Sequence, residues 1–330
     1  MAPAIRIENL SVWFEPQAGD RKQHAVRNVS VAANRGETLC IVGESGSGKT
    51  LTAGAMMRLL PYNAKVEMEG LYLGDQDLMR LSERELSAVR GARIGLVFQN
   101  PTVALNPAFT IGNHLEETWQ RHRGGSRREA RARAIQSLVR VGITAPEQRL
   151  AQYPHQLSGG LCQRVGIALA LICEPEIVIA DEPTTALDVT TQAQILRLLA
   201  DLQQETGMAL ILITHDLRIV SRMADRVAVM YAGQVVETGD REAIFSKNAH
   251  PYTRALLDSV PAAGRGRLAT IAGTPPVLTQ DDPACAFRAR CGFAQAVCAS
   301  QPVSLEEIGP AHSARCLFPF VANRAPMVVT

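Results

Sequence analysis

The sequence predicts an α/β fold with a mainly parallel sheet and helices on its faces. Three apolar segments have the length of buried strands, and stretches with helical patterning separate them; they span residues 94–98, 177–180 and 210–214. A strand that is covered on both faces is apolar throughout, as these segments are. Buried strands that alternate with helices are typical of a parallel sheet in an α/β protein.

Three further regions surround these segments. Residues 5–42 alternate apolar and polar positions, which predicts an antiparallel sheet ahead of the core. Residues 105–172 have helical patterning throughout and indicate a helical insertion into it. Residues 227–230 and 234–237 flank Tyr231-Ala232-Gly233 and predict a hairpin.

Composition limits the classes of protein to which the chain can belong. The 330 residues are 46% hydrophobic and 20% charged, with a formal net charge of +2, which indicates a globular chain and gives no sign of a polyanion-binding surface. No apolar run approaches the roughly 18 residues that cross a bilayer, and the first residues lack the core of a signal peptide. We therefore expect the chain to stay in the cytosol.

One glycine-rich segment carries the strongest functional signal, because it fits G-x-x-x-x-G-K-[ST] and lies between a strand candidate (38–42) and a helix candidate (51–60). Glycines let backbone N–H groups turn toward one point at a helix start, which is how proteins hold nucleotide phosphates. Lys49 would reach the β- and γ-phosphates, and the Thr50 hydroxyl would ligate Mg²⁺. The alternative is a plain glycine-rich turn. The segment comprises Gly43, Glu44, Ser45, Gly46, Ser47, Gly48, Lys49 and Thr50.

Two adjacent carboxylates follow the second strand candidate. A buried parallel strand delivers its last residues to the ligand edge of a sheet. Asp181 is then placed to hold Mg²⁺ through water, and Glu182 to orient or deprotonate an attacking water. Two surface acids before Pro183 are the alternative interpretation.

The segment Leu157-Ser158-Gly159-Gly160-Leu161-Cys162-Gln163-Arg164 closely resembles the signature of ATP-binding cassette (ABC) proteins. A hydroxyl and glycine N–H groups at a helix start form a second phosphate cradle. The resemblance implies that Ser158, Gly159, Gly160 and Gln163 act on ATP held by a different subunit, so that two cassettes enclose two ATP molecules.

Other residues match further motifs of that family. The resemblance implies that Gln99 is a Mg²⁺ ligand that senses the transmembrane partner, and that Asp188 lies at the dimer seam. His215 matches the switch histidine that contacts the γ-phosphate. Phe14 occupies the place of the ring that stacks on adenine, or else it packs in the core beside Trp13.

Within the family, the chain most resembles the ATPase subunits of oligopeptide and dipeptide importers, the group that also serves nickel. Segments 153–160, 180–188, 213–217, 230–239 and 250–253 carry this resemblance. It implies an ATP-hydrolysing subunit at the cytoplasmic face of the inner membrane. Its partners would be a second ATPase subunit, identical or homologous, two transmembrane permease subunits and an extracytoplasmic substrate-binding protein.

The resemblance also implies the organisation of the chain. We expect a P-loop NTPase core of the ABC type at 1–260, with an N-terminal antiparallel β subdomain and a helical subdomain at about 105–172. From about residue 261 the sequence is rich in proline and glycine, which indicates a linker. Residues 261–330 are expected to comprise this linker and a small cysteine-bearing extension.

The alternative function is a cassette ATPase that acts on nucleic acid or ribosomes. Repair cassettes insert long coiled coils between the two phosphate-binding motifs, but Lys49 and Ser158 are separated by about one hundred residues without a sustained heptad pattern. Translation-factor cassettes carry two copies in one chain, and this chain has one. The sequence therefore favours transport.

Four cysteines in the last 46 residues predict a metal site, since disulfides are rare in the cytosol and thiolates select zinc or iron–sulfur clusters. The importer group has a similar tail, with which a [4Fe-4S] cluster is associated; zinc and unligated thiols are the alternatives. These residues are Cys285, Cys291, Cys298 and Cys316, whereas Cys40, Cys162 and Cys173 are expected to be small core residues.

Overall fold

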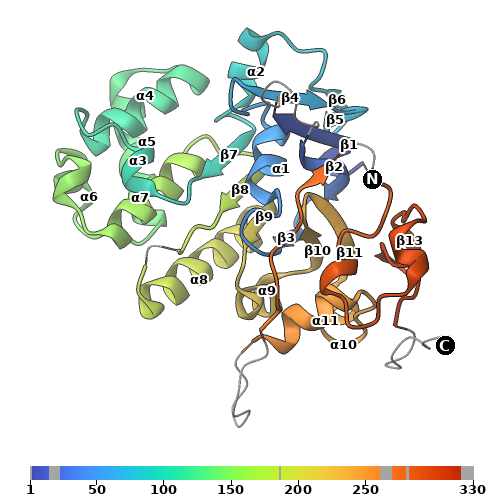
Figure 1. Ribbon diagram of the computed structural model, residues 1–330. Helices are drawn as coiled ribbons and strands as arrows, with labels where there is room; N and C mark the ends of the chain where they lie inside the picture. The colour runs from blue at the N-terminus through green and yellow to red at the C-terminus, as the bar shows by residue number, and fades with distance from the viewer. Residues whose placement is uncertain (1, 15–22, 186, 261–269, 280–281, 321–330) are drawn as a thin grey trace. The chain divides into compact units, whose positions relative to one another are not determined.

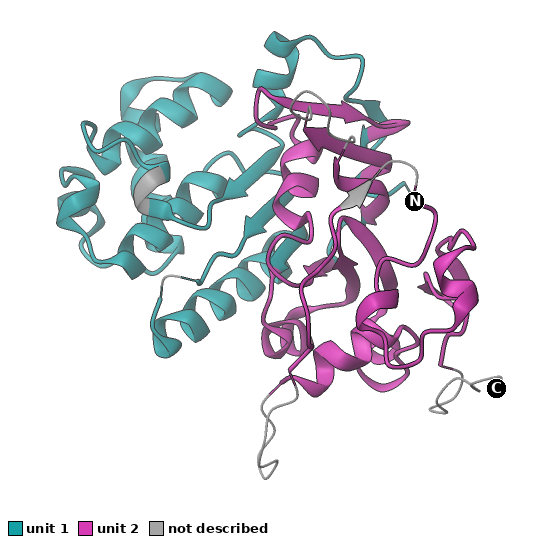
Figure 2. Ribbon diagram, in the orientation of Figure 1, with its two compact units in different colours: residues 1–5, 33–37, 72–213 teal, residues 6–32, 38–71, 214–330 magenta. Residues whose placement is uncertain are grey.

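The computed structural model describes residues 2–14, 23–185, 187–260, 270–279 and 282–320. The chain forms two compact units, and each unit gathers segments that are far apart in the sequence (Figures 1 and 2). Unit 1 consists of residues 1–5, 33–37 and 72–213; unit 2 consists of residues 6–32, 38–71 and 214–330.

The core of unit 1 is a set of parallel strands. Strand β8 (Ile177–Asp181) pairs in parallel with β7 (Ile94–Val97) on one side and with β9 (Ala209–Thr214) on the other. Every residue of β9 is buried, as are the first four residues of β8. The three predicted core strands are therefore confirmed, and burial on both faces explains why they lack alternation.

Helices fill the region expected to be a helical insertion (Figure 1). Two of these helices begin with a capping box, formed by Thr110 with Asn113 in one helix and by Ser126 with Glu129 in the next. The hydroxyl of Ser137 donates to the carbonyl of Ala168 at 3.0 Å and so ties two of the helices together. These helices are α4 (Ile111–Arg123), α5 (Arg127–Arg140), α6 (Pro146–Leu150) and α7 (Gly159–Leu171).

The remaining elements of unit 1 lie before, between or after these helices. They are β5 (Gly70–Leu73), at whose centre the chain passes from unit 2 to unit 1, β6 (Gln76–Asp77), α2 (Glu83–Val89), α3 (Pro101–Ala104), η1 (Pro154–Gln156) and α8 (Val189–Thr206).

Unit 2 contains an antiparallel sheet formed largely by the N-terminal strands. Strand β1 (Ile5–Phe14) lies between β2 (Gln23–Ala33) and β4 (Ala64–Glu67), and β12 (Leu278–Thr279) adds to the far side of β2. The predicted N-terminal antiparallel sheet is confirmed, but residues 38–42 of the predicted region form a separate parallel strand.

That strand, β3 (Thr38–Val42), pairs in parallel with β10 (Arg226–Tyr231), which forms the predicted hairpin with β11 (Gln234–Asp240). Two strands that the sequence did not predict continue this sheet: β14 (His312–Ala314) pairs with β11, and β13 (Glu306–Gly309) pairs with β14. Strands β13 and β14 of the C-terminal extension are therefore part of the sheet that contains β10 and β11.

Helix α1 (Lys49–Met56) follows β3 and is shorter than the predicted helix 51–60. Arg58 adopts a positive φ of 50°, which an α-helix does not allow, and the Leu59 N–H returns to the Gly54 carbonyl at 2.8 Å. A local hydrogen bond around Gly54 therefore ends the helix before Pro61. The other elements of unit 2 are α9 (Leu217–Met223), α10 (Arg241–Ser246), α11 (Pro251–Asp258), η2 (Arg288–Arg290) and η3 (Ala296–Ala299).

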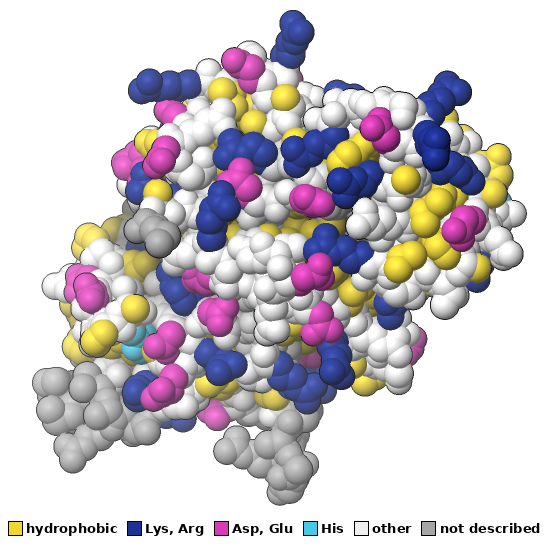
Figure 3. Space-filling model, turned by 180° about the vertical axis from the view of Figure 1, so that it is seen from behind, with side chains coloured by type: hydrophobic (Ala, Val, Ile, Leu, Met, Phe, Trp, Pro, Cys, Tyr) yellow, Lys and Arg dark blue, Asp and Glu magenta, His cyan; other side chains and the backbone are white. Residues whose placement is uncertain are grey.

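The cysteines that were expected in the core are there, since Cys40, Cys162 and Cys173 are each 0% exposed. On the face that Figure 3 shows, basic and acidic side chains are interspersed and no large patch of one sign forms, in keeping with the small net charge. In the described part of the chain, no helix combines the length and the apolar character needed to cross a membrane.

Candidate functional site

The glycine-rich loop of unit 2 lies between β3 and α1, the context that its motif requires. A Cβ atom on Gly43 would lie 2.1 Å from the Met230 carbonyl oxygen, so only glycine fits against β10. Gly48 precedes α1 with φ at 94°, a backbone region that glycine occupies readily. The two glycines thus let the loop approach its neighbours closely and turn into the helix.

Lys49 closes this loop on itself. Its Nζ donates to the Gly43 carbonyl at 2.8 Å and to the Glu44 carbonyl at 2.9 Å, and the residue is 5% exposed. Ser45, Gly46 and Thr50 are exposed, so backbone N–H groups and the Thr50 hydroxyl can meet a ligand from solvent. The arrangement provides a buried positive charge inside a loop of amide donors at a helix N-terminus, which suits phosphate.

Two neighbours hold the loop in place. The Gly233 N–H donates to the Ser47 carbonyl at 3.1 Å, and the Glu44 N–H donates to the Tyr252 hydroxyl at 3.0 Å. The turn between β10 and β11 and the start of α11 therefore act as supports. The sequence did not predict this role for Tyr252, because no local pattern links residues about two hundred positions apart.

The predicted carboxylates lie at the C-terminal end of β8 in unit 1. Asp181 is the last residue of the strand, and Glu182 follows it with a positive φ of 44°; both are half-buried. The Glu182 N–H donates to the Ile213 carbonyl of β9 at 3.0 Å, which holds this strained conformation. Non-glycine residues with such a backbone are uncommon and concentrate at functional sites.

Gln99 and Thr185, both in unit 1, donate side-chain hydrogen bonds to the Glu182 carboxylate. Gln99, two residues beyond β7, donates from Nε2 to Oε2 at 3.1 Å, and the Thr185 hydroxyl donates to the same oxygen at 2.8 Å. The structure thus brings two of the predicted catalytic residues together. Sequence reasoning missed Thr185, although its place three residues after Glu182 was a usable signal.

The signature segment and Asp188 lie beside each other in unit 1. Ser158 begins α7, and its hydroxyl accepts from the Leu161 N–H at 3.4 Å. Asp188 begins α8 and accepts from the Thr191 N–H at 3.0 Å and from the Thr191 hydroxyl at 2.7 Å. A Cβ atom on Gly160 would lie 2.8 Å from Thr191 Cγ2, so the starts of the two helices are in close contact.

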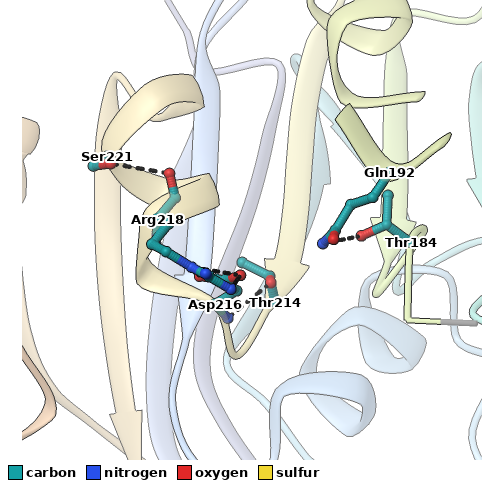
Figure 4. Close-up of polar contacts among 6 residues, drawn as sticks. All are labelled: Thr184, Gln192, Thr214, Asp216, Arg218 and Ser221. Carbon is teal, nitrogen blue, oxygen red and sulfur yellow. Dashed lines mark hydrogen bonds and ion pairs between the residues drawn. The ribbon is translucent and has the colours of Figure 1, made fainter. Parts of the chain in front are cut away.

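Two further side chains, those of Gln163 and Thr184, are buried near the starts of α7 and α8. Gln163 is 1% exposed and points into the unit, and its Nε2 has no hydrogen-bond partner among the described residues. Thr184 is 5% exposed and accepts from Gln192 Nε2 at 3.1 Å (Figure 4), which ties α8 to the segment after Glu182. The hydrogen bonds of Asp188 hold the pKa of its carboxyl below the usual value, so it stays ionised.

His215 follows β9 and is exposed in unit 2. Hydrogen bonds of the neighbouring residues hold the backbone around His215. The Asp216 N–H donates to the Thr214 hydroxyl at 3.0 Å, and Arg218 Nη2 donates to Asp216 Oδ2 at 2.7 Å (Figure 4). The Arg218 guanidinium is the main reason why the pKa of Asp216 lies below its usual value. Phe14, the predicted adenine contact, is half-buried at the end of β1 opposite Ala64.

The four C-terminal cysteines line one small pocket of unit 2, together with Phe287, Phe293 and Phe318. Burial raises the pKa of Cys285 and Cys291, and it raises the pKa of Cys316 to about 12. Four thiols with partly apolar walls suit a soft metal or an iron–sulfur cluster. In the residues that the structure describes, however, no three His, Cys, Asp or Glu side chains are gathered as closely as metal ligands require.

Known proteins are similar to this chain in sequence and in fold. Residues 26–185 match the family model described as ABC transporter, and residues 236–298 match the one described as oligopeptide/dipeptide transporter, C-terminal region. The dipeptide transport ATP-binding protein DppD of Bacillus subtilis is 50% identical over 90% of this chain and 89% of the relative. DppD of Escherichia coli is 45% identical over 96% of both chains.

Among solved structures, a dimeric post-hydrolysis state of the ATP-binding cassette MJ0796 bound to ADP and Pi superposes with a TM-score of 0.64. It is 31% identical and covers 72% of this chain and 98% of that chain. The identity, the coverage and the phosphate-binding loop support one another. The chain belongs to the ABC transporter family, in the group of dipeptide and oligopeptide transport ATP-binding proteins, and is an ATP-hydrolysing enzyme.

Proposed function

We propose that this chain couples ATP hydrolysis to the import of peptides or related small solutes through a membrane complex. The single observation that carries the proposal is the fixation of Glu182 at the end of a parallel strand by Gln99 and Thr185. A carboxylate held there has the task of orienting and activating water. The relatives named for dipeptide and oligopeptide transport support the choice of substrate class.

ATP binds with its phosphates on the loop of Lys49. Thr50, Gln99 and Asp181 offer a hydroxyl, an amide and a carboxylate oxygen, which is the ligand set that Mg²⁺ prefers. When bound, Mg²⁺ neutralises the charge on the β- and γ-phosphates. Phe14 stacks on the adenine ring.

The ATP site is completed by a second ATPase subunit, identical or homologous. Its signature covers the nucleotide on this chain, while Ser158, Gly159 and Gly160 cover the partner's nucleotide, with Gln163 behind them and Asp188 at the seam. The dimeric structure of MJ0796 supports this arrangement. Glu182 and His215 then promote attack of water on the γ-phosphate, and the catalytic effect is mostly positioning and charge stabilisation.

Closure of the two ATPase subunits drives two transmembrane permease subunits, and an extracytoplasmic binding protein delivers the solute. The chain then acts as a peripheral subunit on the cytoplasmic face of the inner membrane. The test is peptide uptake by vesicles that contain the assembled complex. We expect uptake to require ATP and to be lost with Lys49→Ala, and ATP-independent uptake would refute the proposal.

We propose further that residues 1–260 form the nucleotide-binding domain and that residues 261–330 form a linker and an extension with a metal site. Cys285, Cys291, Cys298 and Cys316 line one pocket, which supports a common ligand. Cysteine binds a metal as the thiolate, so protons leave when the metal binds and occupancy should increase with pH.

We favour a [4Fe-4S] cluster over zinc at this site. The test is analysis of iron, sulfide and zinc in anaerobically purified protein, with Cys298→Ser as the variant and Cys40→Ser as the control outside the pocket. Brown protein with equal iron and sulfide that loses both in Cys298→Ser supports the cluster. Stoichiometric zinc, or neither metal in the parent protein, contradicts it.

A further inference from the structure

The phosphate-binding loop is joined to the cysteine-bearing segment by an ion pair within unit 2. Arg290 Nη1 lies 2.8 Å from Glu44 Oε2, and Nη2 lies 3.1 Å from Oε1, so the two groups face each other in a bidentate pair. The Arg290 side chain is 6% exposed and that of Glu44 is 24% exposed. Bidentate pairs of this kind are stronger and more specific in geometry than single contacts, and burial reduces screening by salt.

Every N–H donor of the Arg290 guanidinium has an acceptor at hydrogen-bond distance. Besides the two Glu44 oxygens, Nε donates to the Ala272 carbonyl at 2.8 Å, Nη2 to the Ile271 carbonyl at 3.0 Å and Nη1 to the Tyr231 hydroxyl at 3.3 Å. An arginine carries five such donors in a rigid plane, and lysine cannot reproduce that pattern. The site is therefore built around an arginine.

Aromatic packing holds the start of the segment that carries Arg290. Phe287 packs edge-on against Tyr231, with ring centroids 5.2 Å apart, and against Tyr252, with centroids 5.4 Å apart. Tyr252 in turn accepts from the Glu44 N–H. The C-terminal segment thus supports Glu44 through its backbone and through its carboxylate.

Glu44 is the second residue of the motif that binds phosphate. A carboxylate in such a loop repels the negative charge of ATP unless a cation neutralises it, because charges a few ångströms apart interact strongly at low effective dielectric. We propose that Arg290 is a positioning residue for ATP binding: it neutralises Glu44 and holds the loop in the conformation that receives the phosphates. This inference rests on the ATP-binding role of the Lys49 loop.

The experiment is a double-mutant cycle on the assembled complex, with the Kd of MgATP as the readout. Arg290→Ala leaves the Glu44 carboxylate without its arginine and should raise Kd roughly tenfold. Adding Glu44→Gln to Arg290→Ala removes the repelling charge and should restore most of the affinity. A purely structural role of Arg290 predicts no such rescue, because Glu44→Gln does not rebuild the contacts of the guanidinium with Ala272 and Ile271.

The matched control is Arg288→Ala, which removes an arginine of the same segment that bonds Asp282 and the Cys285 carbonyl instead of Glu44. We expect its Kd to equal that of the parent. An unchanged Kd in Arg290→Ala, or equal weakening in Arg290→Ala and in the double variant, would overturn the inference. Failure of the parent complex itself to bind MgATP would instead contradict the ATP-binding role.

Discussion

The amide of Gln99 donates to the carboxylate of Glu182, with 3.1 Å between Nε2 and Oε2. Gln99 follows one parallel strand of unit 1 and Glu182 follows the neighbouring strand, so the sheet register brings residues 83 positions apart into contact. The same carboxylate oxygen accepts from the Thr185 hydroxyl. Glu182 is thus held by a side chain that follows the neighbouring strand and by one from its own segment.

Thr185→Val removes the hydroxyl donor with little change in shape. A hydrogen bond to a charged group contributes on the order of 1.5–3 kcal/mol, so we expect ATP turnover to fall roughly tenfold at unchanged ATP affinity. The measurement is kcat together with the Kd of MgATP in the assembled complex. Thr206→Val, whose hydroxyl bonds backbone groups at the far end of α8, serves as the control, and equal turnover in both variants would refute the role of Thr185.

Gly160→Ala places a methyl group 2.8 Å from Thr191 Cγ2, which forces the starts of α7 and α8 apart. We expect ATP-dependent association with the second ATPase subunit to be lost while this chain still binds ATP on the Lys49 loop. Light scattering with and without ATP measures the association.

Gly166→Ala is the matched control, since its nearest neighbour, Pro101 Cβ, would lie at an ordinary 3.8 Å in the same helix. We expect this variant to associate normally and to gain about 0.5–1 kcal/mol from the better helix former. Normal association of Gly160→Ala would show that the signature does not lie at the interface.

Lys49→Ala removes the buried ammonium of the phosphate-binding loop. The loss of charge-assisted hydrogen bonds to phosphate should weaken MgATP binding roughly 10- to 100-fold. Lys247→Ala controls for the loss of a positive charge, because Lys247 is exposed and pairs with Glu242. Isothermal calorimetry on both variants is the measurement, and equal affinities would contradict the assignment of Lys49.

His250 gives the fold a pH dependence. The residue is 0% exposed, and burial lowers its pKa from 6.5 to about 4, although the nearby Glu237 carboxylate opposes the shift. Between these two values the unfolded chain binds a proton that the folded chain does not, so stability falls as pH drops from 6.5 toward 4. The full effect is about 3 kcal/mol.

The test is urea unfolding at pH 7 and pH 5 for the parent and for His250→Asn. Asparagine can still accept from the Tyr252 N–H, as His250 Nδ1 does at 3.0 Å, but it does not titrate. We expect a smaller loss of stability at pH 5 in the variant. An identical loss in both proteins would assign the pH dependence to other groups.

The sequence predicted what depends on local pattern. The glycine spacing of residues 43–50 and the apolar run before Asp181 lie within single segments, so their conformations could be inferred directly. The early end of α1 could not, because the αL conformation of Arg58 and the return of Leu59 to Gly54 have no distinct sequence signal.

Contacts between residues far apart in the chain could not be predicted from the sequence for a related reason. The pair between Glu44 and Arg290 joins residues 246 positions apart, and the pairing of β14 with β11 joins the C-terminal extension to the core sheet. Both involve the C-terminal extension, whose described part consists largely of irregular segments and short elements. Such a segment has no periodicity from which its position could be predicted.

The central claim is that Glu182 serves the chemical step and not the binding of ATP. The most direct test is Glu182→Gln in the assembled complex, with MgATP affinity and ATP turnover measured on the same preparation. Loss of a positioned base predicts unchanged affinity and a fall in turnover of about 10²- to 10⁴-fold. Near-parental turnover in a variant that binds ATP normally would contradict the claim.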